Sequence, residues 1–334
     1  MRTRIFISGS ALANASGGAL AYGIAQAKGT LAPWRILFIV EGLPTCAVAV
    51  ACWFFIPDSP DKAYFLKGRD REVAIALALR QPGDRTGKQG LQWKQVLGAL
   101  LDYRSKQSLS FRDKANPVCL GYIPGLIYFC INVCFASLPL FVPTIISEMG
   151  AFTSIQSNGL SAPPYLLCWI MIVTVTFISD RVNIRGPFVA APGLVAAIGY
   201  ILLGTSKTVA VRYFGLFLAT QIFISVAMTL TWVGNTHATD SKRAGAFAIL
   251  ATFGQCGPVL WTNIFPKTDA PYYRKGMWIS CCACLMVFVL ACVQSTLLWR
   301  ANKKRDRKYG VNRDFEHVDS GGGMGFDKRF RYVI

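Results

Sequence analysis

WRILFIVEGLPTCAVAVACWFFIPDSP, residues 34–60, is the stretch that decides the fold. Its apolar run from Ile36 to Pro57 has about 22 residues, which at 1.5 Å per residue are enough to cross a hydrocarbon layer roughly 30 Å thick. Trp34 and Arg35 precede the run and a turn rich in Pro and Asp follows it, and these residue types are typical of the places where a span meets water. The stretch therefore predicts a membrane-spanning helix.

Inside this run lies Glu41, the one formally charged side chain within the apolar runs of the chain. An ionised carboxylate surrounded by lipid is costly, so Glu41 is expected to face protein, to pair with a cation or to carry a proton. Two interpretations stay open. Glu41 forms a structural ion pair with Arg35 or with a neighbouring helix, or it takes up and releases a proton as part of the function.

The composition of the whole chain agrees with a membrane location. The chain has 334 residues, of which 53% are hydrophobic, and its mean hydropathy of +0.40 is too high for an ordinary soluble domain. The net charge of +18 could indicate a nucleic-acid partner, but the charges avoid the apolar runs and gather between them. Basic loops of a membrane protein explain the charge, so no nucleic-acid partner is expected.

Eight apolar runs are long enough to span a bilayer. They are Ile5–Ala27, Ile36–Pro57, Val118–Ile146, Leu160–Ser179, Gly186–Ser206, Tyr213–Thr236, Ala244–Pro266 and Gly276–Trp299. A membrane β-barrel would instead show alternating hydrophobicity in segments of about ten residues. The predicted fold class is therefore an all-α membrane protein, a bundle of eight transmembrane helices.

The Lys and Arg residues predict the orientation. If the N-terminus is cytoplasmic, 28 of the 35 basic residues lie on the cytoplasmic side and seven on the other side. Cytoplasmic loops of membrane proteins carry this kind of excess. Both termini are therefore predicted to be cytoplasmic.

One long polar connection separates the second and third runs. Residues 71–80 (REVAIALALR) and 91–103 (LQWKQVLGALLDY) have helical spacing of apolar residues, which predicts two amphipathic helices at the cytoplasmic surface. The polar stretch 105–117, SKQSLSFRDKANP, is interpreted as a linker.

Polar side chains deep in the apolar runs are the candidates for a binding site. Asn132, Gln221 and Gln255 either line a cavity or hydrogen-bond between helices, because both roles need an inward-facing side chain. Trp232 and Asn235 are either site residues or an interface anchor and a helix cap. Tyr165 either shapes the outer mouth of a cavity or is an interfacial aromatic, and Tyr128 lies one turn before Asn132.

No Lys or Arg is assigned to the inside of a span, so an anionic ligand would have to be bound by amide donors and by the N-termini of broken helices, or by a cation outside this chain. Six prolines in the runs are placed either to break helices or to kink them. They are Pro124, Pro139, Pro143, Pro163, Pro164 and Pro258.

Other chemistries find no support in the sequence. The eleven Cys residues lie in or beside apolar runs without a paired CxxC frame, and there are only two His residues. No GxxxxGK[ST] phosphate loop is found. We therefore expect no metal, no cofactor and no enzymatic activity.

Several segments together carry a family resemblance. WRILFIVEGLPT, FFIPDSPDKAYFLKGRDREVAIALALR, LPLFVPTIISEMG, SAPPYLL, SDRVNIRG, VRY, TLTWVGNTHATDSKRAGAFAI and DAPYYRKG occur in this order. The chain resembles the fungal anion:cation symporter branch of the major facilitator superfamily, which includes the allantoate and nicotinate permeases. The resemblance implies that SDRVNIRG is the second-half copy of a cytoplasmic motif in which Asp180, Arg181 and Arg185 help to gate the inward side.

The resemblance also implies a domain plan. Members have six plus six spans, and WRILFIVEG resembles the opening of the sixth, so this chain would match spans 5–12 and lack the first four. Residues 1–57 would then be the last two helices of the N-terminal bundle, 58–117 a cytoplasmic linker, 118–299 the C-terminal six-helix bundle and 300–334 a basic cytoplasmic tail.

The function implied by the resemblance is secondary active transport. The expected activity is proton-coupled symport of a small organic anion such as nicotinate, pantothenate or allantoate, by alternating access, in a monomer surrounded by lipid in the plasma membrane. The alternative is a truncated, transport-inactive membrane protein.

Overall fold

The computed structural model describes residues 2–26, 31–57, 62–80, 116–150, 152–182, 184–236, 240–261, 264–265, 269 and 272–309. Within these residues all of the regular secondary structure is helical, which confirms the predicted fold class. The helices are α1 (Arg2–Ala25), α2 (Pro33–Phe55), α3 (Gly68–Arg80), α5 (Asn116–Met149), α6 (Ser154–Val182), α7 (Gly186–Thr205), α8 (Val209–Ala219), α9 (Ile222–Thr236), α10 (Asp240–Trp261) and α11 (Arg274–Tyr309).

Most of the predicted runs become helices that are long and apolar enough to cross a membrane. In the described part of the chain there are six such candidates, in which α8 and α9 together form one, and a shorter apolar stretch covers Gly245–Leu260 of α10. α1 is helical over the run predicted for it but is not among the six. The number of eight spans therefore stays a prediction.

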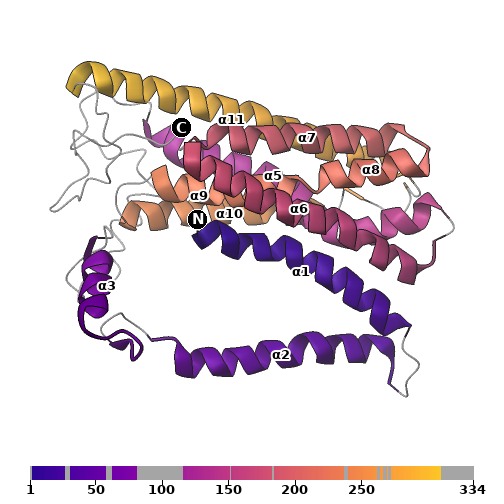
Figure 1. Cartoon of the computed structure of the whole chain (residues 1–334). Helices are drawn as coiled ribbons and strands as arrows, with labels where there is room; N and C mark the ends of the chain where they lie inside the picture. Colours follow the sequence, from indigo (N-terminus) through magenta and orange to yellow (C-terminus); the bar gives the residue numbers. More distant parts are fainter. Residues whose placement is uncertain are drawn as a thin grey trace.

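The helices α5 to α11 form one bundle of rods (Figure 1). α7 packs along α11 and α10 along α5, and a continuous core of aliphatic and aromatic side chains joins α5, α6, α7, α9 and α11. α7 and α8 approach each other most closely at Gly199, where a Cβ atom would lie 2.5 Å from the backbone nitrogen of Ala219. Small residues of this kind allow two membrane helices to touch through their backbones.

α1 and α2 differ sharply in how they pack. α1 lies against α6 (Figure 1), and a Cβ at Gly18 would lie 2.7 Å from the Ser161 hydroxyl oxygen. α2 returns along α1 but lies away from the bundle, and none of its residues is buried. This 23-residue apolar helix therefore leaves most of its side chains exposed.

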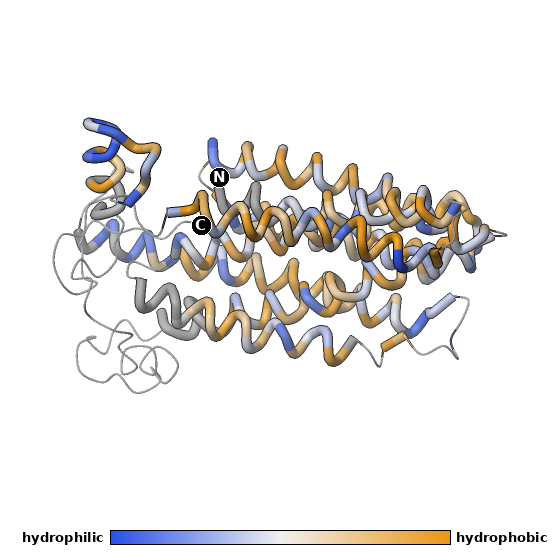
Figure 2. The backbone as a smooth tube through the Cα atoms, turned by 90° about the horizontal axis from the view of Figure 1, so that it is seen from below, coloured by the Kyte–Doolittle hydropathy of each residue, from blue (hydrophilic) through white to orange (hydrophobic). Residues whose placement is uncertain are grey.

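The start of α1 and the end of α11 lie at the same end of the bundle (Figure 1). We call this the inner end and the opposite one the outer end, following the predicted orientation. Hydrophobic residues predominate along the rods, and hydrophilic residues are concentrated toward their ends (Figure 2). This distribution is the one expected of helices that cross a hydrocarbon layer.

The connection after α2 matches the prediction in part. The predicted amphipathic helix at residues 71–80 is found within α3, whereas the one at 91–103 and nearly all of the predicted linker lie outside the described residues. At the other end of the chain α11 continues ten residues beyond the predicted boundary at Trp299, to Tyr309.

Candidate functional site

The most irregular point inside a span is the junction of α8 and α9 at Thr220 and Gln221. Here the backbone amides of Gln221, Phe223 and Ile224 donate to carbonyls three residues back, at 3.2, 3.2 and 3.0 Å, instead of four residues back as in an α-helix. The carbonyl oxygen of Phe217 accepts hydrogen bonds from the side chains of Thr220 (3.1 Å) and Gln221 (2.9 Å). The span is therefore a broken helix.

The break faces the double proline of α6. The Thr220 hydroxyl donates to the carbonyl oxygen of Pro164 at 3.4 Å, and the Cys168 thiol donates to the carbonyl oxygen of Thr220 at 3.1 Å. Both Thr220 and Cys168 are fully buried. The irregular junction of α8 and α9 thus contacts the double-proline segment of α6 inside the bundle.

Of the two roles predicted for the six prolines, breaking the helix is not observed. All six prolines lie inside helices that continue past them, three in α5, two in α6 and one in α10. The only break within a candidate span of the described residues falls at Thr220 and Gln221, where side-chain hydrogen bonds to a backbone carbonyl replace the helical ones.

Gln221 was predicted either to line a cavity or to bond between helices. Its side chain is buried, its amide nitrogen bonds back to its own helix, and its amide oxygen Oε1 is buried without a hydrogen-bond partner. A buried amide oxygen without a donor is costly, so a further group that donates to it is expected in the working protein.

Asn132 is a second buried amide. It lies on α5 one turn after Tyr128, and its amide nitrogen Nδ2 is buried without a hydrogen-bond partner. A Cβ at Gly254 of α10 would lie 2.7 Å from this nitrogen, so the Tyr128–Asn132 pair faces α10 where that helix has no side chain. The close approach of α5 and α10 depends on this glycine.

Tyr165 and Trp232 lie in the core and not at a membrane interface. Tyr165 is 2% exposed, and its ring centroid lies 5.6 Å from that of Phe223. Trp232 is 3% exposed and packs under Gly186, where a Cβ would lie 3.5 Å from its ring. Both side chains are therefore part of the buried interior of the bundle, Tyr165 against an aromatic ring of α9 and Trp232 against the start of α7.

The remaining predicted site residues are not gathered with these. Asn235 and Gln255 are exposed, on α9 and α10 respectively. Glu41 is exposed on α2 and its carboxylate points toward α1, where a Cβ at Gly17 would lie 3.8 Å from Oε1. Arg35 stacks on Trp34, with its guanidinium carbon 5.1 Å from the ring centroid, and does not pair with Glu41 in the described structure. The predicted Arg35–Glu41 pair is thus absent because six helical residues place the two side chains too far apart.

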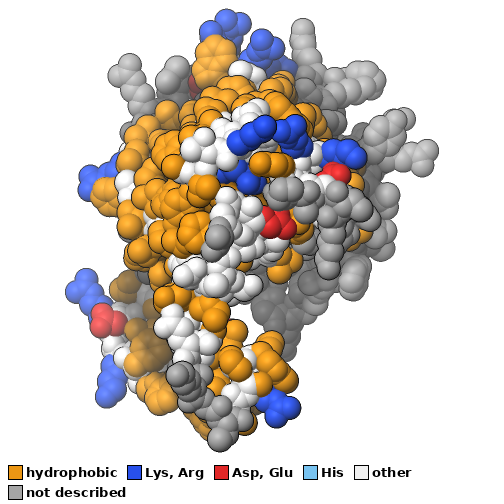
Figure 3. All heavy atoms as spheres, turned by 90° about the vertical axis from the view of Figure 1, so that its right-hand side faces the viewer, with side chains coloured by type: hydrophobic (Ala, Val, Ile, Leu, Met, Phe, Trp, Pro, Cys, Tyr) orange, Lys and Arg blue, Asp and Glu red, His pale blue; other side chains and the backbone are white. Residues whose placement is uncertain are grey.

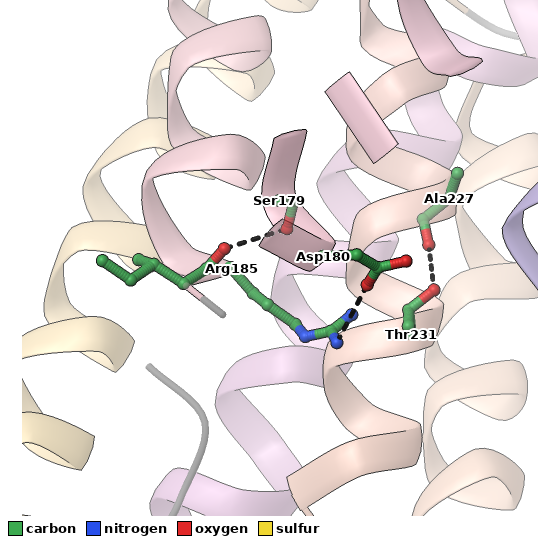
Figure 4. Close-up of polar contacts among 6 residues, drawn as sticks. Ser179, Asp180, Arg185, Ala227 and Thr231 are labelled. Carbon is green, nitrogen blue, oxygen red and sulfur yellow. Dashed lines mark hydrogen bonds and ion pairs between the residues drawn. The ribbon is translucent and has the colours of Figure 1, made fainter. Parts of the chain in front are cut away.

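The SDRVNIRG motif connects α6 and α7 at the inner end (Figure 4). The Arg185 guanidinium lies 3.5 Å from the Asp180 carboxylate, and the Ser179 hydroxyl donates to the Ile184 carbonyl oxygen at 2.9 Å. Arg185 is 6% exposed, so this ion pair is partly shielded from water. Arg181 takes no part in it, because its guanidinium lies 5.2 Å over the ring of Phe177 on the same helix.

A group of charged and aromatic side chains at the outer end was missed from the sequence (Figure 3 views this end). α8 begins at Val209, so Arg212 lies inside a candidate span and is only 2% exposed. Its guanidinium carbon lies 5.1 Å over the ring of Tyr272 and interacts electrostatically with Glu148 at the end of α5. The expectation that no basic residue lies within a span is therefore wrong. The helix starts four residues earlier than the apolar run, and the ring of Tyr272 stacks on the cation.

Tyr273 completes this outer group. Its hydroxyl donates to Glu148 Oε1 at 3.1 Å, while Glu148 Oε2 is buried without a hydrogen-bond partner. Burial and the nearby carboxylate both raise the pKa of Tyr273 above its ordinary value, so the hydroxyl stays protonated and remains a donor. The backbone φ of Tyr273 is +43°, a conformation that is rare for residues with a side chain, and its carbonyl accepts the first hydrogen bond of α11.

Comparison with known proteins adds the decisive observation. The family model described as Major Facilitator Superfamily matches residues 4–262. The chain belongs to this family. Major facilitator proteins are membrane transporters, which agrees with the predictions of a multi-pass membrane protein and of a protein that is not an enzyme.

Similar proteins are fungal transporters. An uncharacterized transporter of Schizosaccharomyces pombe is 29% identical over 311 residues, covering 92% of this chain and 58% of the relative. The MFS transporter prlL of a fungal species is 30% identical over 320 residues, covering 93% and 60%. The high-affinity nicotinic acid transporter of Saccharomyces cerevisiae is 27% identical over 306 residues, covering 91% and 54%. The chain thus spans between 54% and 60% of the length of these relatives.

For this major facilitator chain, sequence reasoning found the inner motif but not the outer group. The inner motif is a local sequence signature. Glu148 at the end of α5, Arg212 in α8 and Tyr273 before α11 are far apart in the chain. The adjacent pair Tyr272–Tyr273 was the one sequence signal that aromatic side chains gather there.

Proposed function

We propose that this chain acts in secondary active transport of a small organic anion, by alternating access of a site near the middle of the membrane. The observation that carries the proposal is the broken helix at Thr220 and Gln221. Discontinuous helices of this kind supply binding groups at the midplane of secondary transporters, because the break leaves polar groups inside the membrane that a ligand can satisfy.

The buried amides indicate what kind of molecule would fit. Asn132 Nδ2 is a donor without a partner on α5, and Gln221 Oε1 is an acceptor without a partner at the start of α9, two helices that pack together. A small carboxylate that also carries an N–H group presents the complementary acceptor and donor. A relative named as a nicotinic acid transporter supports a small carboxylate as the substrate, whereas the N–H group is a feature of pantothenate and allantoate and not of nicotinate, whose ring nitrogen is an acceptor. Nicotinate, pantothenate and allantoate are the molecules to test, and Tyr128 on α5 and the buried Tyr165 on α6 are further candidates for contact with the substrate.

Coupling and gating are assigned to other residues. We assign proton coupling to Glu41, the one acid of the predicted apolar runs, with Arg35 at the same helix end. We assign inner gating to the Asp180–Arg185 pair, which ties the end of α6 to the start of α7. The proposal includes a monomer in the plasma membrane with both termini in the cytoplasm, as the distribution of basic residues favours.

Uptake tests the proposal. The full chain is expressed in a yeast strain that lacks its own nicotinate permease, and uptake of labelled nicotinate, pantothenate, allantoate and biotin is measured at external pH 5 and pH 7. One of these substrates should accumulate faster at pH 5. Gln221→Ala and Asn132→Ala should each lower the uptake at least tenfold, since each removes a buried hydrogen bond to the substrate.

The matched control is Thr252→Val on α10, whose exposed hydroxyl bonds only to the Ala248 carbonyl of its own helix, at 2.8 Å. Uptake by the control should equal that of the unchanged chain. If Gln221→Ala and the control transport equally well, the broken helix is not the binding site. Glu41→Gln should abolish the pH dependence without affecting the amount of protein in the membrane.

A second candidate is a membrane protein without transport activity. It is favoured by α2, which has no buried residue. A chain that reaches the membrane in normal amounts and accumulates none of the four substrates at either pH would support this candidate and remove the first.

A further inference from the structure

The outward face of α11 is apolar over most of its length and basic at its inner end. Trp278, Leu285, Val289 and Val293 are each between 39% and 53% exposed, as is Trp299. At 100° per residue all of them lie within about 60° of one line along the helix. The opposite side of α11 carries buried residues such as Cys284, Val287 and Leu298 that pack into the bundle. α11 thus has one continuous stripe that faces away from the protein.

The two tryptophans mark the edges of the apolar part of this stripe. They are 21 residues apart, a helical rise of about 32 Å, which is close to the thickness of the hydrocarbon layer of a bilayer. Tryptophan is the side chain that prefers the two boundaries of that layer. Trp278 and Trp299 therefore place the bilayer along α11, with Trp299 at its inner boundary.

Beyond Trp299 the same stripe becomes basic. Arg300, Lys303 and Arg307 are exposed, and the helical period keeps them within the same 60° as the apolar residues. The Lys303 ammonium lies 4.9 Å over the ring of Trp299, which holds the cation at the boundary. The one acid described in this segment, Asp306, is half-buried on the flank of the stripe.

We propose that the inner end of α11 is a docking surface for anionic phospholipids. Phosphate groups bind Arg300, Lys303 and Arg307, and the acyl chains of the same lipids lie along the apolar stripe between the two tryptophans. The apolar stripe and the cations follow each other on one face of the helix. This arrangement favours a lipid as the ligand, because a soluble anion would contact the cations alone. The predicted orientation places these cations at the cytoplasmic leaflet, where anionic lipids are concentrated.

Lipid binding by the full chain tests the proposal. The purified chain in detergent is titrated with phosphatidylserine or with phosphatidylcholine of the same acyl chains, and bound lipids are counted by native mass spectrometry. Phosphatidylserine should bind at least tenfold more tightly. Replacing Arg300, Lys303 and Arg307 by Gln should weaken its binding by about fivefold for each cation removed and leave phosphatidylcholine binding unchanged.

Two matched variants give the controls. Replacing Lys207, Arg274 and Lys275 by Gln removes three exposed cations at the outer end of the bundle, and should leave lipid binding unchanged. Exchanging Arg for Lys and Lys for Arg at 300, 303 and 307 keeps the charge and should retain the binding. If the outer-end variant loses as much affinity, or the charge-preserving variant loses it too, the α11 stripe is not the docking surface.

A soluble competitor separates a lipid from a free phosphate. Glycerophosphoserine, which has the headgroup without acyl chains, should not displace phosphatidylserine at equal concentration, and equal competition overturns the proposal. If the triple Gln variant is not monodisperse, the single variant Lys303→Gln replaces it, with an expected loss of about fivefold.

Discussion

Tyr273→Phe tests the outer group, in which Glu148 of α5, Arg212 of α8 and Tyr273 before α11 lie together. The substitution removes the hydroxyl that donates to Glu148 at 3.1 Å and keeps the ring that packs near Phe141 and Phe265. A hydrogen bond to a charged group contributes about 1.5–3 kcal/mol. The loss is expected in this range, because the second carboxylate oxygen of Glu148 already has no partner and cannot compensate.

The assay heats samples of the purified chain in detergent to a series of temperatures and measures by size-exclusion chromatography how much folded protein remains at each. At about 2–4 °C per kcal/mol for a bundle of this size, the apparent melting temperature should fall by roughly 3–12 °C. The control is Tyr272→Phe, which removes a neighbouring hydroxyl but keeps the ring on which Arg212 and Arg274 stack. Equal melting temperatures for the two variants would refute the assignment of the Tyr273–Glu148 bond as a stabilising contact.

The pH dependence gives a second readout of the same bond. The folded-state pKa of Tyr273 is raised above its ordinary value of 10.0, so its contribution is fully present below about pH 10 and is lost as the pH rises through the folded-state pKa. The unchanged chain should therefore lose stability above pH 10 relative to Tyr273→Phe. A constant difference between the two proteins from pH 8 to pH 11 would contradict this linkage.

Two further predictions concern helix contacts. Gly199→Ala should destabilise the chain by about 1–3 kcal/mol, since the new Cβ would lie 2.5 Å from the backbone of α8, whereas Gly42→Ala, with nothing within 4 Å, should be neutral or slightly stabilising in the same melting assay. Asp180→Asn should lower the initial rate of uptake and cost about 1–3 kcal/mol, because it removes the carboxylate beside the buried Arg185 while Asp180 itself is 28% exposed. Arg181→Gln should change neither quantity, and an equal effect of both substitutions would show that the ion pair is not the gating contact.

The sequence was sufficient to predict the helical bundle, since long apolar runs between basic segments have few other solutions. It also indicated the inner motif, because Asp180 and Arg185 are only five residues apart. It could not predict the break at Gln221, which depends on side-chain hydrogen bonds to a single carbonyl and not on a proline. Nor could it place Tyr165 and Trp232 in the core, since interfacial and buried aromatics look alike in a sequence.

Arg212 shows a further limit of reading apolar runs. An arginine next to such a run is assigned to water by its charge, but α8 begins before it and the ring of Tyr272 stacks on it. Glu148 at the end of α5 and Tyr272 before α11 are far from it in the chain, so no window of local sequence contains the information that the residue is buried.

The fit of Gly186 under α11 has a mechanical consequence. A Cβ at this position would lie 2.9 Å from the Cβ of Ser295, so the first turn of α7 and the inner half of α11 are in contact without any slack. Arg185, the residue just before Gly186, is held by Asp180 on α6. A tilt or shift of α11 is therefore expected to move the Asp180–Arg185 ion pair as well. The inner end of the same helix carries the cations that we assign to the lipid headgroups. If both proposals hold, a change in bilayer composition is expected to alter the Asp180–Arg185 pair, and with it the proposed inner gate.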